Sequence, residues 1–181
     1  PYSDDTIITD MTPQQIIDYG IKLKLIERIP HILGDIIQVA GKQAALLSYF
    51  RNNILHVFIL LSFLSALVAR NGRIERSRLN SIAEQLYPFL QSELFLYYSA
   101  HGLQETLNKK VDSLLASGLI VELGDGMLSV PETNSKCYQQ LQVLATPVEQ
   151  SLERYFMTLA LLAQQGSGNL TENEVVDLCH L

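Results

Sequence analysis

The chain has 181 residues, 48% of them hydrophobic, and its mean hydropathy is +0.14. This composition excludes an intrinsically disordered protein, and the length allows one sizeable domain or two small ones with a hydrophobic core. The net charge of −6 and the pI of about 5.1 argue against broad electrostatic attraction to nucleic acid. Cys137 and Cys179 match no metal-ligand spacing, and no signal peptide opens the chain, so we expect reduced thiols in a cytosolic setting.

The first helical signal is Thr12, a suitable N-cap, with Pro13 at the first helical position. An apolar stripe with helical spacing follows and predicts a helix that ends before Pro30; its members are Ile17, Ile21 and Leu25. Residues 34–39 form a candidate strand around Ile36, which can add to a small sheet.

A second helical pattern begins near Lys42 and runs through residues 54–69, in which the polar residues are His56, Ser62 and Ser65. These three fall on different sides of a helical wheel, so this helix is apolar all round and must be buried in protein or in lipid. A membrane span needs about 20 apolar residues. The stretch has only 16, and His56 makes insertion more costly, so we favour a buried or interface-resting helix over a span.

Four of the 13 basic residues follow this helix within nine positions. Arginines beside an apolar segment are typical of a protein that rests on anionic lipid. The alternative is a solvated turn, in which these arginines pair with acids such as Glu75 or Glu84. The candidate membrane-contact residues are Arg51, Phe58, Phe63, Arg70, Arg73, Arg76 and Arg78.

Asn71-Gly72 breaks the apolar helix, and Ser77 is a plausible N-cap for the next one, which Pro88 should kink or divide. The apolar face of that helix comprises Ile82, Leu86, Phe89 and Leu90. A cleaner stripe follows over residues 103–117, and Gly118 is well placed as its C-cap. This stripe consists of Leu103, Leu107, Val111, Leu114 and Leu115.

Two short apolar runs, Leu119 to Leu123 and Met127 to Val130, are separated by Gly124-Asp125-Gly126 and predict a β-hairpin over 119–130. A further amphipathic helix begins near Pro147; its apolar residues are Val148, Leu152, Tyr155, Phe156, Leu159 and Leu162. Gln164 to Asn169 reads as a polar loop.

Thr171 and Glu174 resemble a capping box, but the helix after it is short; its apolar residues are Val175, Val176, Leu178 and Leu181. With Pro1 at the start, this leads us to expect a fragment of a longer protein. The predicted fold is mainly α, a helical domain with a small winged-helix-like hairpin. We expect two parts: residues 1–70, with the apolar helix 54–69, and residues 71–181, truncated at the C-terminus.

The sequence contains no phosphate loop, nucleophile elbow or zinc-ligand spacing. His31 and Asp35 are four apart but lie in a predicted loop, and His101 and Glu105 are four apart at a helix start. We interpret both pairs as surface or cap residues, and His56 as a core histidine bonded to a backbone carbonyl. We therefore assign no catalytic residue, cofactor or metal.

The predicted helix, glycine and hairpin over residues 103–130 match the pattern with which winged-helix domains end. Only Lys109 and Lys110 are basic on that helix, while the wing carries Glu122 and Asp125. Without positive charge there is little to hold phosphates. A helical, winged-helix-like interaction module that binds protein, and less favourably nucleic acid, is thus one of two candidate functions.

Three segments carry a family resemblance: MTPQQIIDYG (Met11 to Gly20), GDIIQVAGKQAALLSYFRNNILH (Gly34 to His56) and LYPFLQSELFL (Leu86 to Leu96). They resemble the C-terminal region of membrane-bound glycerol-3-phosphate 1-O-acyltransferases, above all the large bacterial enzyme. The resemblance covers nearly the whole chain in the same order. It implies a parent enzyme that transfers an acyl chain from acyl carrier protein or acyl-CoA to the sn-1 hydroxyl of glycerol 3-phosphate, in phospholipid synthesis.

The family's chemistry lies upstream, in a domain marked by His-x4-Asp, whose histidine is the general base, and by a Phe-Pro-Glu-Gly block. Neither motif occurs in this chain, so no catalytic residue can be carried over, and we expect the fragment alone to be inactive. The resemblance implies the upstream catalytic domain as a partner. From the apolar helix and its arginines we expect an anionic membrane surface as a second partner, and from the charge we expect no nucleic acid. The expected location is the cytoplasmic face of the inner membrane, as a peripheral protein.

Overall fold

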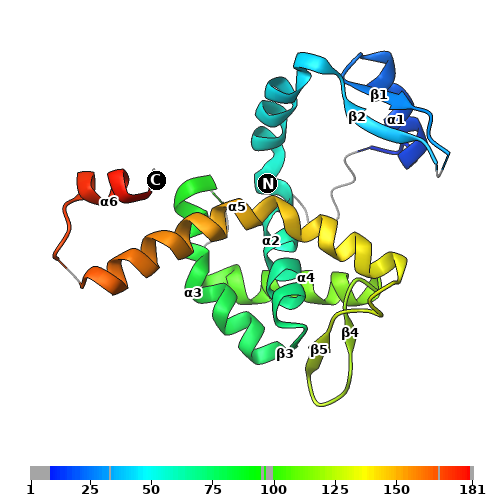
Figure 1. Cartoon of the computed structure of the whole chain (residues 1–181). Coiled ribbons are helices and arrows are strands. Elements are labelled where there is room, and N and C mark those ends of the chain that lie inside the picture. Colours follow the sequence, from blue (N-terminus) through cyan, green and yellow to red (C-terminus); the bar gives the residue numbers. More distant parts are fainter. Residues whose placement is uncertain (1–8, 33, 95, 97–99, 167, 180–181) are drawn as a thin grey trace. The chain divides into compact units, whose positions relative to one another are not determined.

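The computed structural model describes residues 9–32, 34–94, 96, 100–166 and 168–179; the side chains of Asn52, Ala100 and His101 are also outside the description. The described chain is mainly helical with small antiparallel sheets, which confirms the predicted fold class (Figure 1). It divides into two compact units, Pro1–Val57 and Phe58–Leu181. The boundary lies inside one long helix, whereas the division expected from the sequence, after residue 70, lies at the C-terminal end of the same helix.

The first unit contains one short helix and a two-stranded antiparallel sheet. Helix α1 (Pro13–Lys22) begins with a complete capping box, in which Thr12 and Gln15 bond each other's backbone N–H groups, as predicted for the N-cap. The expected helix was too long, because Lys24 takes a positive φ of 57° and the chain then enters strand β1 (Ile26–Ile29). The predicted strand is present as β2 (Ile36–Val39), and its partner is β1 rather than the later hairpin.

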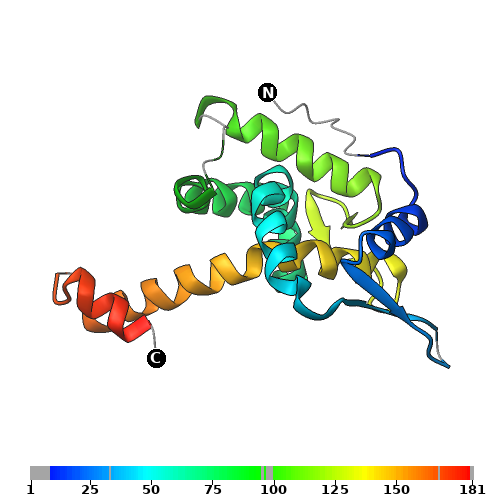
Figure 2. The same ribbon diagram turned by 90° about the horizontal axis from the view of Figure 1, so that it is seen from above.

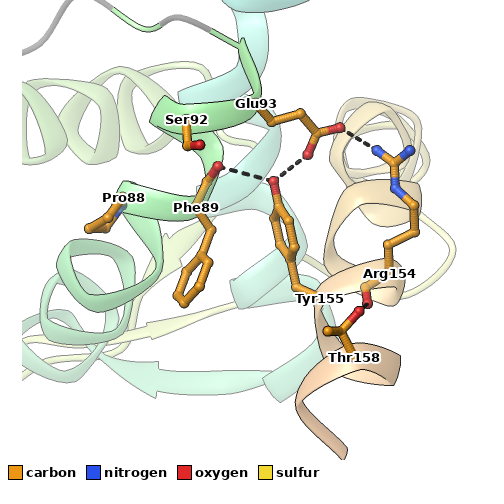
Figure 3. A pocket seen from close by; sticks show the side chains of 7 residues that line it. All are labelled: Pro88, Phe89, Ser92, Glu93, Arg154, Tyr155 and Thr158. Carbon is orange, nitrogen blue, oxygen red and sulfur yellow. Dashed lines mark hydrogen bonds and ion pairs between the residues drawn. The ribbon is translucent and has the colours of Figure 1, made fainter. Parts of the chain in front are cut away.

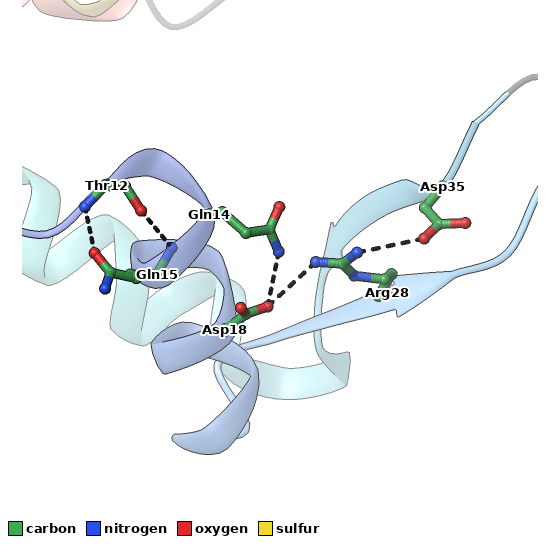
Figure 4. A network of polar contacts seen from close by, with 6 residues as sticks. All are labelled: Thr12, Gln14, Gln15, Asp18, Arg28 and Asp35. Carbon is green, nitrogen blue, oxygen red and sulfur yellow. Dashed lines mark hydrogen bonds and ion pairs between the residues drawn. The ribbon is translucent and has the colours of Figure 1, made fainter.

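Arg28 on β1 joins α1 to the sheet within this first unit (Figure 4). Its guanidinium lies 3.3 Å from Asp18 on α1 and 3.4 Å from Asp35, directly before β2. Gln14 also donates to the Asp18 carboxylate, at 2.9 Å. These side chains are partly exposed, so the ion pairs orient α1 relative to the sheet but contribute little to the free energy of unfolding.

The predicted apolar helix, residues 54–69, lies in the C-terminal part of helix α2 (Ala44–Asn71), which follows a short 3₁₀ turn, η1 (Gly41–Gln43). Residues Asn53–Asn71 are long and apolar enough to cross a membrane, by length and composition. The second half of α2 is nevertheless packed into the second unit, where Ile59 and Val68 are fully buried. We therefore interpret this half as a core helix.

The second unit continues with strand β3 (Arg73–Glu75), helix α3 (Arg76–Leu94), helix α4 (Ala100–Ala116) and strands β4 (Val121–Glu122) and β5 (Met127–Ser129). The predicted hairpin is confirmed as β4 and β5, while β3 was missed. The sheet order is β3-β5-β4, with all pairs antiparallel. This unit is winged-helix-like, because its elements follow in the order α2, β3, α3, α4 and the β4–β5 hairpin, and β5 lies between β3 and β4 in the sheet.

The C-terminal end of α4 follows a local signal, whereas the start of α3 does not follow the expected one. Gly118 takes a φ of 69° after α4, and the N–H groups of Gly118 and Leu119 bond the carbonyls of Leu115 and Leu114, so the predicted C-cap is confirmed as a Schellman motif. The prediction of Ser77 as an N-cap was wrong, because α3 already begins at Arg76, directly after β3. Helix α3 runs through Pro88, so the helix is not divided there.

Two helices complete the unit: α5 (Lys136–Gln165) and α6 (Glu172–Cys179), which contacts α5 (Figure 2). The predicted start of α5 near Pro147 was wrong, because the side chain of Ser135 caps the helix and Pro147 lies inside it. Helix α6 begins after the predicted Thr171 capping box; Leu181, expected on its apolar face, lies outside the described residues.

The core of the second unit is built from the second half of α2, which is buried on nearly all sides, from one face each of α3, α4 and α5, and from the sheet. The sequence stripe on α4 is confirmed, since four of its five members are buried. On α3 the expected face was partly wrong: Leu90 is buried, but Phe89 is exposed and Tyr87 takes an inner position. The fully buried large side chains include Ile59, Phe63, Leu64, Leu79, Leu90, Leu107, Leu114, Ile120, Leu128 and Leu141.

Candidate functional site

The carboxylates of both histidine and carboxylate pairs in the sequence are engaged by basic side chains. Asp35 is engaged by Arg28, and Glu105 pairs with Lys109 at 3.0 Å on the same helix face. The side chain of His101 lies outside the described residues, and His56 is half-buried on α2. Within the described part of the chain, no group of three His, Cys, Asp or Glu side chains could hold a metal ion.

The arginines in the last turn of α2 and directly after it differ in their surroundings. Arg70 lies 3.3 Å from Glu149 and 3.7 Å from Glu153 on α5. Arg76 pairs with Asp112 on α4 at 2.8 Å and also bonds Asn108. These two arginines therefore connect neighbouring helices.

Arg73 and Arg78 are exposed, and so is Arg51, while Phe58 is half-buried. Phe63 is fully buried in the core, so it offers no surface to a membrane. A helix that looks apolar on all sides does not reveal which of its residues the protein covers. The lipid contact of the other candidates stays a prediction.

The structure adds a cleft between the end of α3 and the middle of α5 (Figure 3), with a volume of about 680 Å³. The α3 side of the cleft ends in Glu93, and the α5 side carries Arg154 and Tyr155. Its lining residues are Pro88, Phe89, Ser92, Glu93, Arg154, Tyr155 and Thr158.

Glu93 is the centre of the polar contacts in this cleft. Its carboxylate accepts hydrogen bonds from the Tyr155 hydroxyl, the Arg154 guanidinium and the buried Ser151 hydroxyl, the last at 3.2 Å. The Tyr155 hydroxyl also lies 3.1 Å from the carbonyl oxygen of Phe89. Burial, and then the hydrogen bond and negative charge of Glu93, raise the pKa of Tyr155 well above its usual range.

This arrangement favours a structural role over catalysis. A phenol whose pKa is raised stays protonated at neutral pH and serves as a hydrogen-bond donor, not as a base. Arg154 is already paired with Glu93. The cluster connects α3 to α5, and nothing in its geometry activates a nucleophile.

A second, more apolar groove shares Tyr155 with this cleft and has a volume of about 570 Å³. Residues from α2, α3 and α5 contribute to it, and Arg70 and Glu153 are its charged members. It is lined by Leu67, Arg70, Leu86, Leu152, Glu153, Tyr155, Phe156, Met157 and Leu159.

Neither the cleft nor the apolar groove was predicted from the sequence. Tyr155 and Phe156 were recognised as members of an amphipathic helix, but Glu93 and Leu86, which line the same hollows, belong to a helix far away in the chain. The 3.6-residue period identifies a helix face without identifying what the face packs against. The one sequence signal for this site was that Glu93 lies in the segment Leu86 to Leu96, which resembles the acyltransferase family.

The fold and these surfaces define a mainly helical, winged-helix-like module. The family model described as "Glycerol-3-phosphate acyltransferase C-terminal region" matches residues 1–181, and the chain belongs to this family. The resemblance inferred from the sequence is thereby confirmed.

Named relatives agree with this assignment. The glycerol-3-phosphate acyltransferase of Xanthomonas axonopodis pv. citri (strain 306) is 34% identical over 182 residues, covering 99% of this chain and 21% of the relative. That of Xylella fastidiosa (strain 9a5c) is 33% identical over 184 residues, covering 100% of this chain and 21% of the relative. The chain thus spans about a fifth of the length of these relatives, and no solved structure matches it.

Proposed function

We propose that this chain is the non-catalytic C-terminal region of an enzyme that acylates the sn-1 position of glycerol 3-phosphate. The acyl donor would be acyl carrier protein or acyl-CoA, and the reaction would serve phospholipid synthesis. The observation that carries the proposal is the family match over all 181 residues.

Two features support a non-catalytic role. The sequence contains neither a His-x4-Asp motif nor a Phe-Pro-Glu-Gly block. The polar cluster of Glu93, Arg154 and Tyr155 is internally paired and connects two helices. Deprotonation of a glycerol hydroxyl requires a positioned base, and the described residues offer none with a suitable geometry.

We further propose that the region supports the catalytic part of the parent enzyme and contributes to peripheral membrane contact. The parent would act at the cytoplasmic face of the inner membrane. Arg73 and Arg78 are the best candidates for contact with lipid phosphates, because their side chains are exposed and no ion pair with them occurs among the described residues.

The test compares the full-length parent enzyme with a form that lacks these 181 residues, using glycerol 3-phosphate and an acyl donor. We expect the full-length enzyme to be active, this chain alone to be inactive, and the shortened form to lose activity or membrane binding. A matched full-length variant without the upstream histidine base shows the background rate. Turnover by this chain alone, or a shortened form with unchanged activity and membrane binding, would contradict the proposal.

A winged-helix-like interaction module is the second candidate function, and the element order of the second unit favours it. Its α4 helix carries Lys109 and Lys110, but Glu105 pairs with Lys109 and the hairpin carries Glu122 and Asp125. This charge pattern favours a protein partner over nucleic acid. Binding of DNA by this chain at physiological salt would contradict this preference for a protein partner.

A further inference from the structure

The distal half of α5 exposes an apolar surface that the rest of the second unit does not cover. Phe156 is 73% exposed, Met157 51% and Leu159 46%. In both views the last turns of α5 extend past α3 towards α6 (Figures 1 and 2). Large apolar side chains gathered on one helix face mark an interaction site more often than isolated ones do.

These side chains border the 570 Å³ groove and make it a continuous apolar strip, which we call the distal α5 groove. Leu67 of α2 and Leu86 of α3 also line it. A groove bounded by three helices accepts the apolar face of a further helix, which presents side chains at helical spacing.

The charges around the groove indicate the nature of the occupant. Glu149 and Glu153 share the single positive charge of Arg70, which leaves the rim with an excess negative charge. The neighbouring α6 is also acidic, with Glu172, Glu174 and Asp177. An anionic membrane surface is repelled by such a rim, whereas a helix with a Lys or Arg beside its apolar face is attracted.

We propose that the distal α5 groove binds an amphipathic, basic-edged helix from the part of the parent protein outside these residues. This chain covers only 20–21% of its relatives, so a parent of similar length has ample sequence to supply such a helix. The inference rests on the proposed function and deepens it by naming the surface through which the region supports the enzyme.

Photocrosslinking of the full-length enzyme in its own membrane tests the surface directly. A benzophenone side chain replaces Phe156 in one protein and Val143 in the other. Val143 is the matched control, because it lies on the same helix, is 74% exposed and does not line the groove. We expect crosslinks from position 156 to peptides outside the 181 residues and none from position 143. Crosslinks from 156 to lipid only, equal crosslinks from both positions, or none from 156 would overturn the proposal.

An activity measurement separates this inference from the proposed function. Phe156→Glu should shift the equilibrium between docked and undocked forms by about tenfold or more, since burial of a phenylalanine is lost, and lower the activity. Val143→Glu adds the same charge and should leave the activity unchanged. Both variants should unfold at the same temperature, which shows that neither substitution acts by destabilising the fold. If deletion of the region abolishes activity while both variants remain fully active, the inference fails and the proposed function stands. If the deletion has no effect, the proposed function itself fails.

Discussion

The hydroxyl of Ser62 on α2 accepts a hydrogen bond from the backbone N–H of Val148 on α5, at 3.1 Å. The same hydroxyl donates to the carbonyl of Ala145, at 3.2 Å. Pro147 lies between these two residues and has no N–H, so the backbone pairing of α5 is interrupted there. Ser62 is fully buried and satisfies polar backbone groups at the interruption.

Ser62→Ala should therefore lower the free energy of unfolding of this chain by about 1–3 kcal/mol, because two buried backbone groups lose a partner. Ser65→Ala is a matched control on the same helix. Ser65 is also fully buried, but its hydroxyl has no hydrogen-bond partner in the described structure. We expect this control to be neutral or stabilising in urea denaturation, and equal losses in both variants would refute the role of Ser62.

The contact between Ser62 and α5 should also depend on Pro147. Pro147→Ala restores the missing N–H and removes the ring that clashes with the carbonyl of Val143, so α5 can close its own backbone hydrogen bonds and the Ser62 hydroxyl becomes less important. In a double-mutant cycle, Ser62→Ala should therefore cost less in the Pro147→Ala background than in the wild type. Strict additivity of the two changes would show that Ser62 does not act through the proline.

Tyr155 should remain protonated in the folded chain at pH values where an ordinary tyrosine ionises. Burial and Glu93 raise its folded-state pKa, so its stabilising contribution is complete below about pH 10 and declines as the pH rises further. Denaturation at about pH 9 and about pH 11, on either side of the ordinary tyrosine pKa, should show a larger loss of stability for the wild type than for Tyr155→Phe. A loss of the same size in both proteins would contradict this.

Helix α6 should lose its N-terminal cap in acid. The Glu174 carboxylate accepts hydrogen bonds from the backbone N–H and the hydroxyl of Thr171, both at 2.8 Å, and these lower its pKa. A lowered folded-state pKa means that the contribution is present above about pH 4.3 and is lost as the pH falls through the folded value. The amide resonance of Thr171, whose N–H bonds the carboxylate, should report this loss, and Glu174→Gln should make its response to pH in that range much smaller.

The arginines in the last turn of α2 and directly after it should contribute unequally to lipid binding by the parent enzyme. Each exposed basic residue near an anionic surface is worth about 1 kcal/mol, so Arg73→Gln with Arg78→Gln should remove up to about 2 kcal/mol at low salt. Arg70→Gln with Arg76→Gln removes the same charge, but these arginines are held by Glu149 and Asp112 and should matter less. Co-sedimentation with anionic vesicles measures both; equal losses would indicate a general charge effect without direct contact.

The sequence determined the elements whose signals are local. Thr12, Thr171 and Gly118 mark helix ends because each satisfies backbone groups within a few residues of itself. The Gly124-Asp125-Gly126 turn marks the hairpin for a similar reason, since all three residues take positive φ values that favour such residues. The family resemblance also required no knowledge of the fold.

Only the tertiary structure decided what each apolar face contacts. The sequence could not show that Phe63 is buried and Phe156 exposed, because both lie in apolar helical patterns and their burial depends on helices that are distant in the chain. The start of α5 before Pro147 was missed because the cost of the proline is offset by Ser62, which belongs to a helix far away in the sequence. Local hydrogen bonds and periodicity belong to a short segment, whereas burial and the partners of a polar group belong to the packed unit.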